Sequence, residues 1–164
     1  MENSKYYKTE FTDKDIEEFF ENHSDTDALL DYPLVYLLYA KNRIYVGETS
    51  NVVNRMKSHL KDKEKNKLEM LSMIYHPKFN KSATYNIETN LIQHISADSS
   101  KLKVLNRTQN IIKNTHNYYD KNFFNQTLFN YVWETLLEEG LASDSIDEIR
   151  NKDGVSLCVR IVVV

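Results

Sequence analysis

A pair of short strand-like runs joined by only three residues is the feature that most constrains how this chain can fold. The two runs, at 35–40 and 44–49, are rich in aromatic and aliphatic side chains, and so short a connection fits only an antiparallel hairpin. Because side chains alternate along a strand, Tyr36 lies on one face of its strand, and Tyr45 shares a face with Gly47. Gly47 has no side chain, so we expect a neighbour or a substrate to approach the backbone closely there.

Helical segments surround this hairpin. Ser50 or Asn51 can cap the helix that follows it directly, and a second apolar run that stops at His76-Pro77 predicts a third strand. The fold class is therefore α+β, with a small three-stranded antiparallel sheet flanked by helices and extra N- and C-terminal helices. The expected helices span residues 11–22, 52–60, 82–97 and 123–139, and the third strand spans 71–75.

The length of 164 residues corresponds to one domain, which composition divides into four parts. Residues 1–32 are an acidic N-terminal helical extension, and residues 33–108 form the core. Residues 109–140 are a helical extension that packs on the core, and residues 141–164 are an acidic linker followed by a β-type tail. Every candidate site residue falls in the second part.

Charge is distributed unevenly along the chain, whose net charge is −3. Residues 1–32 carry a net charge of −7, residues 33–133 carry +8, and residues 134–164 carry −4. Binding to an anionic polymer requires such a basic segment, since lysine and arginine neutralise phosphates. An ordinary solvated loop is the alternative reading of the lysines at 61–67. The candidate nucleic-acid-binding residues are Arg43, Lys57, Lys61, Lys63, Lys65 and Lys67.

Cys158 is the only cysteine, which excludes an internal disulfide and a zinc site built from cysteines. Residues 1–31 are acidic and lack the apolar segment of a signal peptide. No apolar run approaches the ~20 residues of a membrane span. We therefore expect a cytoplasmic protein with no membrane association and no small-molecule cofactor.

Arg55 and His59 lie four residues apart, so both fall on one edge of the apolar stripe of the helix at 52–60. From that edge, a cation and an imidazole can reach across the rim of the sheet. A surface pair without a role is the alternative for these two residues taken alone.

Glu88 falls inside an apolar arc of the helix at 82–97, between Ile92 and Ile95. A carboxylate in that position is costly unless a metal ion, an arginine or several donors compensate it. A buried salt bridge to an arginine or a lysine is thus the alternative to a metal. His94 lies on the same arc and is interpreted as a hydrogen-bonded core residue.

The ordered set of these side chains resembles the GIY-YIG nuclease family from about residue 34 to residue 106. Leu34-Val35-Tyr36 and Tyr45-Val46-Gly47 take the places of the two tripeptides, with Leu34 replacing the first glycine. The residues that match the family's site are Tyr36, Tyr45, Arg55, His59, Glu88 and Asn106.

The resemblance implies a GIY-YIG-like fold and a metal-dependent endonuclease that hydrolyses phosphodiester bonds in nucleic acid, with DNA as the expected substrate. One Mg²⁺ or Mn²⁺ ion on Glu88 would neutralise charge at the phosphate, and Arg55 would hold a phosphate oxygen. Either Tyr36 or His59 would accept the proton of the attacking water. A tyrosine base needs a pKa well below its usual ~10, which Arg55 and the metal are expected to provide. Positioning of water, phosphate or the glutamate is implied for Tyr45 and Asn106.

The chain is also similar to nuclease domains that precede P-loop ATPase or helicase-like regions in some bacterial proteins. This similarity rests on residues 116–119 and on the helix that contains Trp133. The chain contains no Gly-Lys-Ser/Thr phosphate loop of its own, so it would be a stand-alone or truncated member of that group, with a helicase or ATPase as an expected partner. A catalytically silent nucleic-acid-binding module of a helicase-like system is the alternative function.

Overall fold

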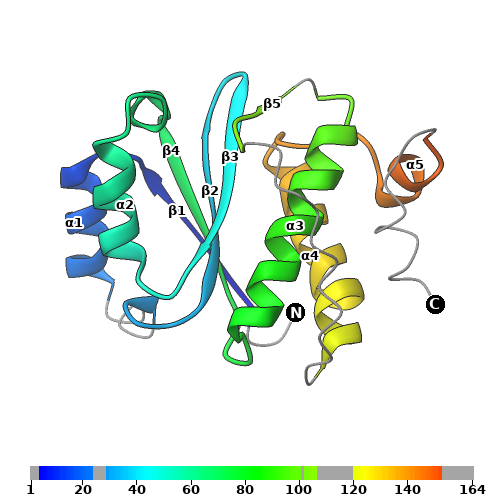
Figure 1. The fold of residues 1–164 in the computed structure, drawn as a ribbon, viewed down its shortest axis with the longest axis horizontal. Helices are drawn as coiled ribbons and strands as arrows, with labels where there is room; N and C mark the ends of the chain where they lie inside the picture. Colours follow the sequence, from blue (N-terminus) through cyan, green and yellow to red (C-terminus); the bar gives the residue numbers. More distant parts are fainter. Residues whose placement is uncertain (1–3, 24–28, 101, 107–119, 153–164) are drawn as a thin grey trace.

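A five-stranded mixed sheet separates two layers of helices in the computed structural model of the protein (Figure 1). Helices α1 and α2 cover one face of the sheet, and α3 and α4 cover the other. The structure describes residues 4–23, 29–100, 102–106 and 120–152. The strands are β1 (Lys5–Glu10), β2 (Leu34–Ala40), β3 (Arg43–Thr49), β4 (Met70–Tyr75) and β5 (Lys103–Val104), and the α-helices are α1 (Asp13–Asn22), α2 (Val52–Leu60), α3 (Lys81–Ala97), α4 (Phe129–Glu138) and α5 (Ile146–Arg150).

The sheet has the strand order β1-β4-β2-β3-β5, so the prediction of three strands was wrong. The predicted antiparallel strands β4, β2 and β3 form its centre, while β1 adds antiparallel to β4 and β5 adds parallel to β3. Strand β1 lacks an apolar alternation because it lies at an edge and is only half-buried. Its two tyrosines face opposite sides of the sheet. Tyr6 donates a hydrogen bond to Ser72, and Tyr7 packs edge-on against Phe19 of α1.

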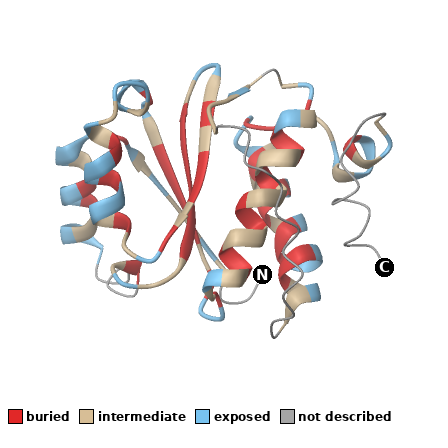
Figure 2. Ribbon diagram, in the orientation of Figure 1, coloured by how far each residue is buried: buried red, intermediate tan, exposed pale blue. Residues whose placement is uncertain are grey.

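Two hydrophobic cores form, one on each face of the sheet. The odd-numbered residues Val35, Leu37 and Tyr39 of β2 pack in the core beneath α3 and α4. The even-numbered residues Leu34, Tyr36 and Leu38 pack in the core beneath α1 and α2. Figure 2 shows the buried residues concentrated on the central strands and on the sides of the helices that face them. The predicted sorting of β2 side chains onto two faces is confirmed.

Side-chain caps begin the helices that carry the candidate site. Asn51 accepts a hydrogen bond from the backbone of Asn54 at the start of α2, and Asn80 accepts one from Ala83 at the start of α3. These caps explain why the two helices begin within a residue of the positions expected from the sequence.

The C-terminal part of the described chain packs on α3 rather than extending away. A π-helical segment (Phe123–Leu128) leads into α4, and Gly140, with φ of +73°, ends that helix. The segment expected as an acidic linker contains α5, whose Ile149 is buried in the core under α3. Residues 116–119 and 155–164 lie outside the described residues. In the part of the chain that is described, no helix combines the length and apolar character needed to cross a bilayer.

Candidate active site

Tyr36 and His59 meet beneath α2. The Tyr36 hydroxyl oxygen lies 2.7 Å from Nε2 of His59, and both side chains are buried, with His59 only 5% exposed. The sequence placed Arg55 and His59 together on the rim of the helix. The structure instead turns His59 inward against the sheet and leaves Arg55 exposed.

Gly47 makes room for the Tyr36 ring. The two residues are paired across β2 and β3, and a Cβ atom added to Gly47 would lie within 3.0 Å of three atoms of the Tyr36 ring and hydroxyl. The close approach predicted at this glycine is thus confirmed, and the neighbour is Tyr36. Any larger residue would push the ring away from His59.

Tyr45 completes an aromatic cluster on the same face of the sheet. Its ring centroid lies 6.3 Å from that of Tyr36 and 5.3 Å from that of His59. The Lys65 ammonium sits 4.5 Å from the Tyr45 ring centroid and 3.7 Å from a carboxylate oxygen of Asp62. Lys65 is thus held against the aromatic cluster by its cation–π contact with Tyr45.

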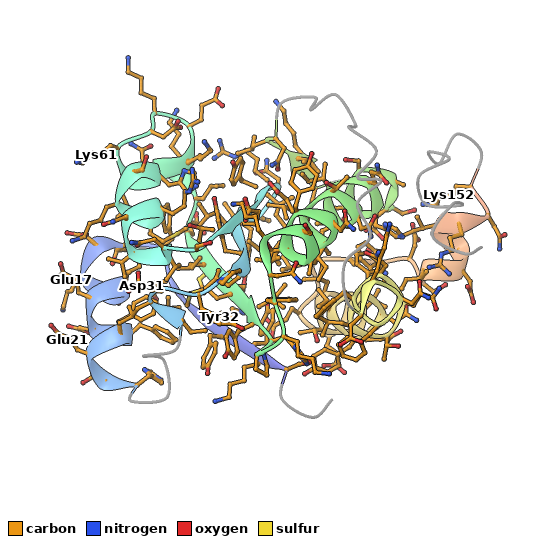
Figure 3. The ribbon with its side chains drawn as sticks, turned by 60° about the horizontal axis from the view of Figure 1, so that its bottom comes forward. Glu17, Glu21, Asp31, Tyr32, Lys61 and Lys152 are labelled. Atoms are coloured by element: carbon orange, nitrogen blue, oxygen red, sulfur yellow. The ribbon has the colours of Figure 1, made fainter. Side chains whose placement is uncertain are left out.

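The other candidate nucleic-acid-binding residues lie outside this cluster. Lys61, Lys63 and Lys67 are exposed in and around the loop after α2, and Figure 3 shows Lys61 at the end of that helix. Lys57 lines a groove between α1 and α2 together with Glu17, on the far side of α2 from His59. The remaining candidate, Arg43, begins β3 and pairs with Lys103 of β5.

Arg55 connects the cluster electrostatically. Its positive charge lowers the pKa of four other side chains of the predicted site. These four groups are Tyr36, Tyr45, His59 and Glu88.

Glu88 is buried and only partly compensated, because the positive charges of Lys81 and Arg55 offset part of the effect of burial. The residue is 7% exposed, and among the described residues no side chain donates a hydrogen bond to its carboxylate or forms an ion pair with it. The alternative of a buried salt bridge is therefore not seen in this part of the chain. Burial, reinforced by the nearby negative charge of Glu48, raises the Glu88 pKa to about 7.

Glu48 is a residue of this site that the sequence reasoning missed. Its carboxylate accepts hydrogen bonds from Lys81 at 2.5 Å and from Thr84 at 3.4 Å, both on α3. A signal was available, because Glu48 directly follows Gly47 in β3. Strand alternation therefore directs its side chain to the face opposite Tyr45, where α3 packs.

Asn106 binds the edge of β3. Its amide oxygen accepts a hydrogen bond from Val46 N at 3.0 Å, and its amide nitrogen donates one to Val46 O at 2.7 Å. The side chain thus continues the pairing of β3 beyond β5, which reaches only Ile44. This contact holds the strand between the Tyr45 and Gly47 positions.

Burial decides the protonation states of the aromatic cluster. Desolvation raises the Tyr36 pKa, and the charge of Arg55 offsets only part of that effect. Arg55 therefore does not by itself bring the Tyr36 pKa below its usual value, and the lowering expected from Arg55 together with a metal stays a prediction. Desolvation, with the charges of Lys65 and Arg55, lowers the His59 pKa to about 4. At neutral pH both groups are uncharged, and the Tyr36 hydroxyl and Nε2 of His59 share one hydrogen bond whose direction is set by the His59 tautomer.

The donor set suits a hard divalent cation held by few protein ligands. Among the described residues, no three His, Cys, Asp or Glu side chains converge in a way that could hold a metal ion. Mg²⁺ does not require such a cage, because it commonly takes one or two carboxylates and completes its shell with water and phosphate oxygens. The buried Glu88 carboxylate, with Glu48 nearby, fits that mode of binding.

Comparison with known families agrees with this geometry. No curated protein and no solved structure matches the chain. The family model described as the GIY-YIG catalytic domain matches residues 32–117, which is more than half of the sequence and contains all six predicted catalytic positions. The chain therefore belongs to the GIY-YIG family, a family of nucleases.

Proposed function

We propose that this protein is a metal-dependent endonuclease that hydrolyses phosphodiester bonds in nucleic acid, with DNA as the substrate. The observation that carries the proposal is the buried Glu88 carboxylate, which forms no ion pair among the described residues and interacts electrostatically with the exposed Arg55 and with Tyr36 of the tyrosine–histidine pair. Burial disfavours the ionised form of this carboxylate, and a bound cation would favour it again. Glu88 would hold Mg²⁺ or Mn²⁺, which when bound supplies positive charge to the scissile phosphate and leaving oxygen.

Proton transfer is assigned to Tyr36 and His59 acting together. The high Tyr36 pKa argues against a phenolate that waits for substrate, and neutral His59 is free to accept a proton at Nε2. We propose that the Tyr36 oxygen takes a proton from the attacking water while its own proton passes to His59. This relay needs no tyrosinate in the resting protein, and the negative phosphate would stabilise the imidazolium that forms.

Two cations are placed to bind the phosphate. Arg55 is exposed and its charge acts on four other side chains of the site, so its guanidinium can contact a nonbridging oxygen where charge develops. Lys65 is held over Tyr45 and can contact the same or the adjoining phosphate. Asn106 would act through β3, by holding the strand that positions Tyr45.

The setting of this activity is proposed from sequence. The basic middle of the chain supports nucleic acid as the partner. The resemblance to nuclease domains that precede helicase-like regions supports a helicase or ATPase as a second partner. The proposed location is the cytoplasm.

The deciding experiment compares the wild type with Glu88→Gln. Plasmid, linear duplex, branched and single-stranded DNA, and RNA, are incubated with each protein in Mg²⁺ or Mn²⁺. We expect cleavage by the wild type and none by Glu88→Gln, whose fold should persist because the amide is isosteric and removes a buried charge. Glu138→Gln, an exposed position on α4, makes the same chemical change away from the site and should cut normally.

Two outcomes would contradict the proposal. Chelator-sensitive cleavage by Glu88→Gln would place the metal elsewhere. Binding of nucleic acid by the wild type without any product would favour a catalytically silent binding module.

A further inference from the structure

Glu48 is a carboxylate that the proposed reaction does not use. Its side chain is only 13% exposed, with one oxygen 2.5 Å from the Lys81 ammonium and the other 3.4 Å from the Thr84 hydroxyl. Both partners belong to α3, so Glu48 joins β3 to the helix that carries Glu88.

The Glu48 and Glu88 carboxylates face the same space. Thr84, which is fully buried, lies one helical turn before Glu88 on the side of α3 that packs on β3. A carboxylate hydrogen-bonded to Thr84 is therefore close to the Glu88 side chain. Burial is the main cause of the raised Glu88 pKa, and the negative charge of Glu48 adds to it, which agrees with that placement.

The two carboxylates differ in their compensation. Glu48 forms an ion pair with Lys81, whereas Glu88 forms none in the described parts of the chain and is influenced by Lys81 and Arg55 only through their charges. The Lys81 side chain is 66% exposed and flexible, so it can leave Glu48 and enter solvent at small cost.

We propose that Glu48 is a positioning residue for the divalent cation held by Glu88 and that Lys81 competes with this cation for Glu48. Mg²⁺ and Mn²⁺ keep several of their waters in such sites, and a second carboxylate can accept hydrogen bonds from those waters. In the free protein, Lys81 neutralises Glu48. A cation held by Glu88 would draw Glu48 away from Lys81, and the Lys81 ammonium would then enter solvent. This inference rests on the proposed function, because it takes Glu88 as the metal ligand.

Binding of Mn²⁺ alone tests the proposal without any cleavage. Electron paramagnetic resonance measures free Mn²⁺ during titration of the folded wild type and of Glu48→Gln, Lys81→Gln and Glu88→Gln. Glu48→Gln should raise the dissociation constant about tenfold, the size typical for loss of an outer-shell partner. Lys81→Gln should lower it severalfold, because a competing charge is removed.

Two control variants separate this competition from a structural effect. Lys81→Arg keeps the charge and should bind Mn²⁺ like the wild type. Lys78→Gln removes an exposed lysine paired with Asp120 and should also leave binding unchanged. Circular dichroism of each variant confirms that the fold is retained.

The outcomes distinguish this inference from the function on which it rests. If Glu88→Gln abolishes Mn²⁺ binding while Glu48→Gln and Lys81→Gln bind like the wild type, the role of Glu48 is refuted and the nuclease proposal stands. If Glu48→Gln and Lys81→Gln change the Mn²⁺ dissociation constant in the same direction, the Glu48–Lys81 ion pair has only a structural role, and the proposed competition is refuted. A wild type that does not bind Mn²⁺, or a Glu88→Gln variant that binds it equally well, would overturn both proposals.

Discussion

Replacing Gly47 by alanine tests the packing on which the site depends. The new Cβ would come within 3.0 Å of the Tyr36 ring and hydroxyl, and Gly47 does not have the positive φ that would strain a larger residue. The whole cost therefore comes from collision with Tyr36. That ring is fully buried between β2 and α2, so it can escape only by moving its neighbours.

The expected loss of stability follows from two effects. Overpacking a well-packed core costs about 1–3 kcal/mol. Displacing the ring also breaks the 2.7 Å contact between Tyr36 and His59, which contributes about 1 kcal/mol. Gly47→Ala should therefore reduce the free energy of unfolding by about 2–4 kcal/mol. Cleavage should fall on the order of 10²-fold, because misplacing a reacting group by about 1 Å has an effect of that size.

Urea unfolding in a double-mutant cycle isolates the collision. In the Tyr36→Leu background the shorter side chain leaves room for the new methyl group, so Gly47→Ala should cost less than about 1 kcal/mol. Gly140→Ala serves as the control, since nothing lies within 4 Å of its added Cβ and only its φ of +73° is unfavourable. It should cost about 1 kcal/mol and leave cleavage unchanged. The reasoning is refuted if Gly47→Ala destabilises the Tyr36→Leu background as much as the wild type.

Three further predictions concern single side chains. Arg55→Ala should slow single-turnover cleavage about 10²-fold with little change in nucleic-acid affinity, because its charge acts mainly in the transition state. Lys14→Gln, at an exposed position on α1, is its control, and a loss of affinity alone would make Arg55 a simple phosphate anchor. Lys65→Gln should reduce cleavage more than Lys67→Gln in the same assay, because Lys65 lies over Tyr45, and equal effects would contradict this. Burial lowers the His94 pKa to about 4, below the ~6.5 of the unfolded chain, so protons bind the unfolded state preferentially as pH falls. Between pH 7 and 4, urea titration should show the wild type losing up to about 3 kcal/mol more than His94→Gln, and a pH-independent difference would disprove the assignment.

Local patterns in the sequence were sufficient for much of the fold. Alternation sorted the β2 side chains, Gly47 indicated a close approach, and the capping signals located α2 and α3. The helical position of Glu88 predicted a buried carboxylate, and that of His94 predicted a hydrogen-bonded core residue. Most of these features follow from the two-residue period of a strand or the 3.6-residue period of a helix. Such periods are visible in the residue types at neighbouring positions of the sequence.

Only the tertiary structure determined which strands form the edges of the sheet and which protonation states the site residues adopt. Strands β1 and β5 are held by backbone hydrogen bonds to residues far along the chain, and such pairing leaves no mark on side-chain periodicity. The protonation of Tyr36 and His59 depends on desolvation, which is set by everything packed around them. Glu48 likewise became part of the site only because α3 packs beside β3. The sequence therefore determined which chemical groups are present. Non-local packing determined which of them are buried away from water, which form hydrogen bonds or ion pairs, and which remain available to a ligand.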